Sequence, residues 1–129
     1  MPVNQELVDN LEVVIGHLQN TDDPSEIHTQ VMAVLWQANV VVEGQGAAWI
    51  SSDMQRAYDK WASIERPEYL PTDGHREQWR IAGRHVCAEA KRFAEHARSA
   101  DQLDAGALNT LADTGYKMGD DLNEGREIH

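Results

Sequence analysis

Apolar residues recur at helical spacing along almost the whole 129-residue chain, and this periodicity restricts the fold more than any other feature. Side chains three or four positions apart share one face of an α-helix, so such stripes predict amphipathic helices. No segment shows the alternation of apolar and polar residues that predicts a half-buried strand. We therefore expect an all-α fold, a compact bundle of four to five helices forming a single domain over residues 1–129.

The first helix is expected over about residues 4–19. Its apolar stripe consists of Leu7, Leu11, Val14, Ile15 and Leu18. A second helix is expected to begin near Pro24. Asp23 as N-cap, Pro24 at the first helical position and Glu26 three residues after the cap form a helix-start signature, because each satisfies or removes an unpaired backbone N–H.

The segment 27–42 of this second helix is apolar almost all round. Its main stripe consists of Ile27, Val31, Val34, Leu35, Ala38 and Val42, and Met32, Trp36 and Val40 lie on the opposite side. Helices of this kind are buried, so we expect helix two to be central in the bundle. Two explanations remain open: the other helices surround it within the monomer, or a homodimer seam runs along Met32, Trp36 and Val40.

Breaks and turns divide the remaining chain. The stripe of Ile50, Met54, Ala57, Trp61 and Ile64 lies about 120° around from the stripe of helix two, so we predict a break or sharp kink at Gly44-Gln45-Gly46. If the helix continued through these glycines, the bundle would have four helices. Two prolines predict a loop at about residues 65–72.

Two further helices are expected after this loop. Thr72 or Asp73 caps the first, whose inward face is formed by Trp79, Ala82, Val86, Ala90, Phe93 and Ala97. Ser99 with Gln102 resembles a capping box for the last helix. Its stripe is Leu108, Leu111, Gly115, Met118 and Leu122, and the tail after about residue 123 is expected to fray.

Charge is distributed unevenly along the sequence, which has a net charge of −11. The first 55 residues contain eight acidic residues and no lysine or arginine, whereas residues 56–98 contain nine basic and seven acidic residues. An acidic field attracts basic partners and repels nucleic acid and anionic lipid. We therefore expect no direct nucleic-acid binding and no membrane association.

This charge predicts a small acidic, non-catalytic binding protein whose partner is a protein with a basic surface, as for inhibitors, immunity proteins and regulatory adaptors. The expected partner-binding residues are acids of the first two helices: Glu6, Asp9, Glu12, Asp22, Asp23 and Glu26. Alternatively, the acids only solubilise the surface, and the apolar face of Met32, Trp36 and Val40 binds the partner. The basic ladder of Arg76, Arg80 and Arg84 is expected to face the acidic half and form surface ion pairs.

The alternative to a binding protein is a helical-bundle enzyme or metal or cofactor binder. His85, Glu89 and His96 share one face of the fourth helix, and a histidine one turn from a carboxylate can hold a metal or relay a proton. The other interpretation of this face is a solvated polar surface. No Glu-x-x-His pair, P-loop or dinucleotide glycine fingerprint occurs, so we expect no cofactor.

The single cysteine, Cys87, lies beside small core-type residues, and we expect a buried, inert thiol. It cannot form an internal disulfide, and the N-terminus lacks the basic and apolar regions of a secretory signal, so a cytoplasmic location is expected. The longest run without charge, residues 27–42, is too short and too polar to span a bilayer.

Two short motifs carry a family resemblance. Trp49 after a glycine-rich break, and Tyr116-Lys117-Met118-Gly119-Asp120 near the C-terminus, resemble the turn tryptophan and the Tyr-x-x-x-acid export signal of the small helical-hairpin proteins of type VII secretion. The resemblance implies a secreted helical protein with a similar small partner. The chain departs from the family in lacking the glycine two residues after Trp49 and in interrupting its first helix at Asp22-Asp23-Pro24.

Overall fold

Five helices make up most of the computed structural model, which describes residues 3–43, 52–64, 73–99, 103 and 105–129. They are α1 (Gln5–Gln19), α2 (Pro24–Glu43), α3 (Ser52–Ser63), α4 (Asp73–Ser99) and α5 (Ala105–Glu124). No strand occurs within these ranges. The prediction of an all-α bundle is confirmed, with five helices.

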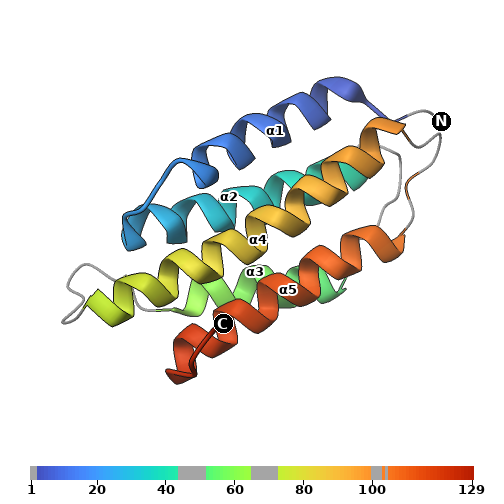
Figure 1. Ribbon diagram of the computed structural model, residues 1–129. Helices are drawn as coiled ribbons and strands as arrows, with labels where there is room; N and C mark the ends of the chain where they lie inside the picture. Colours follow the sequence, from blue (N-terminus) through green and yellow to red (C-terminus); the bar gives the residue numbers. More distant parts are fainter. Residues whose placement is uncertain (1–2, 44–51, 65–72, 100–102, 104) are drawn as a thin grey trace.

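The bundle is built around α2, which contacts each of the other four helices. In Figure 1, α4 and α5 lie in front of α2 and α3, and α1 lies along the upper edge. Two contacts show that α2 and α3 run antiparallel: His28 near the start of α2 meets Trp61 near the end of α3, and Trp36 meets Tyr58. They are therefore separate helices, although the predicted break at residues 44–46 lies outside the described residues.

The core follows the predicted stripes closely. Val8, Leu11, Ile15 and Leu18 of α1 are buried, as is the inward face of α4 from Trp79 to Ala97. In α3 the buried side chains are Met54, Ala57 and Trp61. Leu7 and Val14 of the predicted first stripe are only partly buried. Ile50 and the loop at 65–72 lie outside the described residues.

Trp61 joins three helices at the centre of the core. Its indole Nε1 donates to the carbonyl of Gly115 in α5 at 2.7 Å, and its own carbonyl lies 2.6 Å from Nε2 of His28 in α2. Trp79 of α4 packs edge-on against its ring at 5.9 Å. The Trp61 indole N–H and the His28 Nε2 atom are thus both paired inside the protein, so burial leaves neither of these two groups unsatisfied.

Local hydrogen bonds fix the starts of the first two helices, and Glu26, the predicted capping partner of Asp23, bonds instead to the side chain of Thr21. Asn4 precedes α1, and its side-chain oxygen accepts from the backbone N–H of Glu6 at 3.1 Å. The second helix begins at Pro24, as the sequence predicts. There the Glu26 carboxylate accepts a hydrogen bond from the Thr21 hydroxyl at 2.8 Å, which closes the turn between α1 and α2.

The predicted capping box at Ser99 is wrong, because Ser99 is the last residue of α4 and α5 begins only at Ala105. The stripe of Phe93 and Ala97 keeps the helix packed on the core up to this point. The Ser99 hydroxyl donates back to the carbonyl of Glu95 at 3.2 Å, a bond that serine forms inside a helix.

The prediction of a frayed tail after residue 123 is also wrong. Gly125 adopts a φ of 71° and ends α5 in a Schellman turn, in which the Arg126 N–H donates to the Asp121 carbonyl at 2.8 Å. This turn directs the chain back onto α4. Ile128 is buried there, and its backbone N–H and carbonyl both bond to the side chain of Gln78.

Candidate functional site

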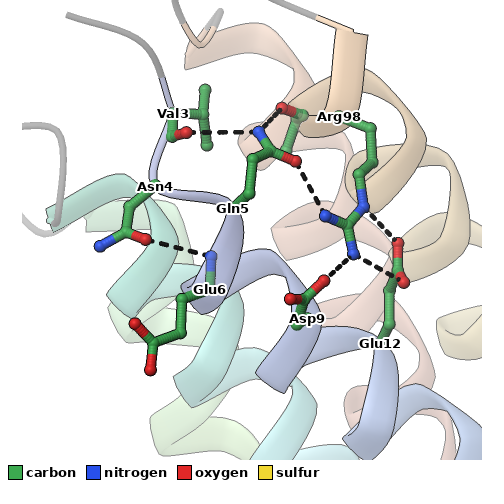
Figure 2. A network of polar contacts seen from close by, with 8 residues as sticks. Val3, Asn4, Gln5, Glu6, Asp9, Glu12 and Arg98 are labelled. Carbon is green, nitrogen blue, oxygen red and sulfur yellow. Dashed lines mark hydrogen bonds and ion pairs between the residues drawn. The ribbon is translucent and has the colours of Figure 1, made fainter.

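The acids predicted to bind a partner are all exposed, but they differ in what they contact. The six are Glu6, Asp9, Glu12, Asp22, Asp23 and Glu26. Figure 2 shows that the Arg98 guanidinium, from the last turn of α4, points between Asp9 and Glu12 of α1. It donates to Glu12 at 3.0 and 2.9 Å, to Asp9 and to the side-chain oxygen of Gln5 at 2.9 Å. Two of the six acids thus share one cation within the molecule, and this cluster keeps a net charge of −1.

The pairing with Arg98 changes the titration of this cluster. Its hydrogen bond holds the pKa of the Glu12 carboxyl below the ordinary value, and the two carboxylates raise the pKa of the guanidinium. Glu6 lies next to this cluster, but its side chain points away from Arg98 (Figure 2). Among the described residues, no side chain pairs with the carboxylate of Glu6 or of Asp23.

Within the described residues, the arginine ladder on α4 meets the acidic half only at Asp22. The Arg80 Nε lies 3.9 Å from Asp22, and its Nη1 donates to Glu77 of the same helix at 2.9 Å. Arg84 lies 4.0 Å from that same Glu77. Arg76 is exposed. The expected pairing of the ladder with the acidic half therefore holds for Arg80 alone.

The predicted metal or catalytic face on α4 is not assembled as a ligand set. Glu89 is paired with Arg92 at 2.6 Å, and Nε2 of His85 lies 2.9 Å from the backbone carbonyl of His129. Within the part of the chain that the structure describes, no three His, Cys, Asp or Glu side chains, those of His85, Glu89 and His96 included, are placed to hold a metal ion. Cys87 is buried, and burial raises the pKa of its thiol, as expected for an inert residue.

An apolar surface is exposed where α2 runs beside α3. Trp36 has an exposed fraction of 55%, although its ring lies 5.8 Å from that of Tyr58. A wide, shallow groove of about 520 Å³, largely open to solvent, follows these two rings, with Met32 and Ala33 on its α2 side. A smaller hollow of about 50 Å³ continues from Trp36 toward Met54. We call this surface, defined by Met32, Trp36 and Tyr58, the α2–α3 groove.

Helix spacing extends the surface along α2. Positions 26, 29, 33, 36 and 40 fall on one side of the helix. Glu26, Thr29 and Trp36 on this line are exposed, and Val40 is half-buried. An acidic residue, Glu26, thus begins this line, and among the described residues no lysine or arginine lines either hollow. The helices described here cover only part of the circumference of α2.

The residues of the export-signal resemblance are engaged inside the molecule. Tyr116 lies beneath the cations of Arg56 and Lys60 of α3, which are 4.8 and 5.2 Å from its ring centre. Asp120 pairs with Lys60 at 3.2 Å and with Arg126 at 2.7 Å. Trp49 lies outside the described residues. The chain forms a five-helix bundle, whereas the resemblance implies a helical hairpin.

Comparisons with known proteins give no further assignment: no protein-family model, no curated protein and no solved structure matches the chain. Among the described helices, none combines the length and the apolar character that crossing a membrane requires.

Two residues of these surfaces, Arg98 and Tyr58, were not predicted from the sequence. Arg98 follows the expected ladder of Arg76, Arg80 and Arg84 by more than three turns, and only the crossing of α1 and α4 shows that it meets Asp9. Tyr58 lies beside the predicted stripe of α3, so its partner Trp36 could be found only from the packing of α2 on α3. The sequence signal for the groove was the second apolar side of helix two.

Proposed function

We propose that this chain is a non-catalytic binding protein and that the α2–α3 groove receives an apolar segment of a basic protein partner. The observation that carries the proposal is the exposure of Trp36 at 55% beside Tyr58. Tryptophan and tyrosine are enriched at the centres of protein interfaces, where large side chains become fully desolvated on binding. Burying such a side chain only on association would stabilise the complex.

Charge supports a basic partner. The chain has a net charge of −11, Glu26 begins the line of positions along α2, and no lysine or arginine of the described part of the chain lines the groove. Glu6 and Asp23 have no side-chain partner among the described residues, whereas Asp9 and Glu12 are already paired with Arg98. We therefore assign the steering of the partner to Glu6, Asp23 and Glu26, and the contact itself to the groove.

The fitting occupant is an amphipathic helix with basic residues beside its apolar face. Helices of this kind bind apolar grooves through side chains spaced by three, four and seven residues. The spacing along α2 from position 29 to position 40 has the same period. A second copy of the chain is a different occupant, since its surface is acidic, and it is an outcome of the experiment below.

The experiment compares four baits in affinity capture from the source cells: the native chain, Trp36→Ser, the triple variant Glu6→Gln, Asp23→Asn, Glu26→Gln, and Val13→Ser. Val13 is the matched control because it is also a large exposed apolar residue, at 58%, on a different helix. We expect a basic protein on the native and Val13→Ser baits, its loss with Trp36→Ser, and weaker, less salt-sensitive capture by the triple variant.

Two results would contradict the proposal. One is capture of the same partner by the Trp36→Ser bait, which would place binding elsewhere. The other is recovery of the chain itself as the sole partner, together with a dimer in sedimentation that Trp36→Ser dissociates.

A further inference from the structure

Another hollow, separate from the α2–α3 groove, lies where the end of α1 and the α1–α2 turn meet α4. Its volume is about 370 Å³, within the range of small-molecule sites. Its walls include the apolar side chains of Leu18, Ile27 and Cys87. In Figure 1 this region lies where α1, α2 and the first half of α4 come together. None of the residues that define the α2–α3 groove lines it.

The rim of this hollow is basic, in contrast to the molecule as a whole. Of the described residues that line it, Arg80, Arg84 and Lys91 are basic and Asp22 alone is acidic, in a chain whose net charge is −11. Glu77 outside the lining pairs with Arg80 at 2.9 Å and lies 4.0 Å from Arg84, so it reduces this charge without cancelling it. An anion that approaches this protein is therefore attracted here and repelled over the acidic α1 face.

The Arg80 guanidinium is only partly paired. Its Nη1 donates to Glu77, and its Nε makes no hydrogen bond among the described residues, with Asp22 3.9 Å away. The Nε atom is covered by protein, whereas the Arg80 side chain as a whole is 40% exposed at the hollow that it lines. A guanidinium forms strong, charge-assisted hydrogen bonds with a carboxylate.

We propose that this hollow binds a small organic carboxylate with an apolar body, such as a medium-chain or aromatic acid. The carboxylate pairs with the exposed part of the Arg80 guanidinium, and Arg84 and Lys91 add attraction at the rim. The apolar body lies against Leu18, Ile27 and Cys87. The ligand needs both its carboxylate and its apolar body, because the rim of the hollow is basic and its walls are apolar.

The test is a titration of the intact protein with octanoate, followed by the amide NMR signals of Thr21, Gly83 and Ala88, which all line the hollow. Octanol lacks the charge, acetate lacks the apolar body, and inorganic phosphate carries charge but has neither an apolar body nor a carboxylate. We expect saturable shifts with octanoate and binding weaker by at least about tenfold for the other three probes.

Two variants locate the site. Arg80→Gln removes the charged fork, and Ala88→Leu fills the hollow from an exposed helical position that tolerates a larger side chain. Each is expected to weaken octanoate binding by at least about tenfold. Arg92→Gln is the matched control, since Arg92 is an exposed arginine of the same helix that pairs with Glu89 and does not line the hollow.

The proposal is overturned if octanoate produces no saturable shift at millimolar concentration, or if phosphate binds as tightly as octanoate. It is equally overturned if Arg80→Gln and Ala88→Leu both bind octanoate like the native chain, or if Arg92→Gln weakens binding as much as Arg80→Gln.

Discussion

At the scale of single residues, the molecule depends on a few side chains that connect helices. Trp61 is fully buried and bonds to both α2 and α5, and Arg98 connects α4 to α1 at the surface. The sequence predicted the burial of Trp61 from its place on the α3 stripe. It could not predict the hydrogen bond to the carbonyl of Gly115, because that residue is 54 positions away in the sequence. The indole also lies so close to Gly119 that a Cβ there would be 2.9 Å from its nitrogen.

Trp61→Phe tests the central connection. Phenylalanine keeps an aromatic ring in the core but loses the indole N–H and leaves unfilled space, so we expect the free energy of unfolding to fall by about 1–3 kcal/mol. Urea unfolding followed by circular dichroism measures this change. Trp36→Phe, at an exposed position, should stay within about 0.5 kcal/mol of the native chain. Equal losses in the two variants would refute the role assigned to Trp61.

Arg98→Gln tests the surface connection through the pKa of Glu12. The folded-state pKa of Glu12 is lowered by its hydrogen bond to Arg98, so the pairing stabilises the fold above the unfolded carboxyl pKa. This contribution is lost as the pH falls through the lowered folded pKa. We expect Arg98→Gln to return the Glu12 pKa toward its ordinary value, measured by carboxyl NMR titration. Arg92→Gln is the control, and an unchanged Glu12 pKa in Arg98→Gln would argue against the pairing.

At the scale of helices, the apolar periodicity predicted which side chains pack inward, whereas the capping patterns predicted only some of the helix starts and ends. The stripes of α1, α4 and α5 and the start of α2 at Pro24 are confirmed because each depends on residues close in sequence. The end of α4 at Ser99 was missed because a serine cap pattern also occurs inside a helix held by core packing. The docked tail was missed although Gly125 is a helix-stop residue, since the contact with Gln78 is long-range.

Two glycines in helices are expected to respond in opposite ways to alanine. A Cβ at Gly119 of α5 would lie 2.9 Å from the indole nitrogen of Trp61, whereas a Cβ at Gly16 of α1 would meet nothing within 4 Å. We expect Gly119→Ala to destabilise the fold by about 1–3 kcal/mol, because the buried indole cannot move away. Gly16→Ala should stabilise it by about 0.5–1 kcal/mol, since alanine favours the helix. Thermal unfolding of both variants decides, and a stabilising Gly119→Ala would contradict the packing described.

The C-terminal segment is expected to behave as part of the core. Ile128→Ala removes buried methyl and methylene groups and should lower the free energy of unfolding by about 2 kcal/mol. Amide hydrogen exchange gives an independent measure, with the Ile128 N–H protected in the native chain through its bond to Gln78. Glu127→Ala, at the exposed neighbouring position, is the control. Rapid exchange of the Ile128 N–H in the native chain would contradict the docked C-terminal segment and support the prediction of a frayed tail.

At the scale of the whole molecule, some of the acidic residues form ion pairs with basic residues of other helices, and the rest remain as an acidic surface. Asp9 and Glu12 are paired with Arg98, Asp22 lies near Arg80, and Asp120 pairs with Lys60 and Arg126. Net charge was predictable by counting, whereas the residues left for a partner depend on which helices cross. The groove was also predictable only in part. The sequence showed that helix two has a second apolar side, but only the packing of the helices shows that Trp36 stays exposed beside Tyr58.

The most direct measurement of the central claim is site-specific photo-crosslinking in the source cells, with a photoreactive phenylalanine analogue placed at position 36 or, as the control, at position 13. Both positions are exposed, so both probes are free to react. The account predicts one protein adduct that forms from position 36 and not from position 13, and whose partner is basic. Adducts of equal yield from both positions, or from position 36 to a second copy alone, would contradict it.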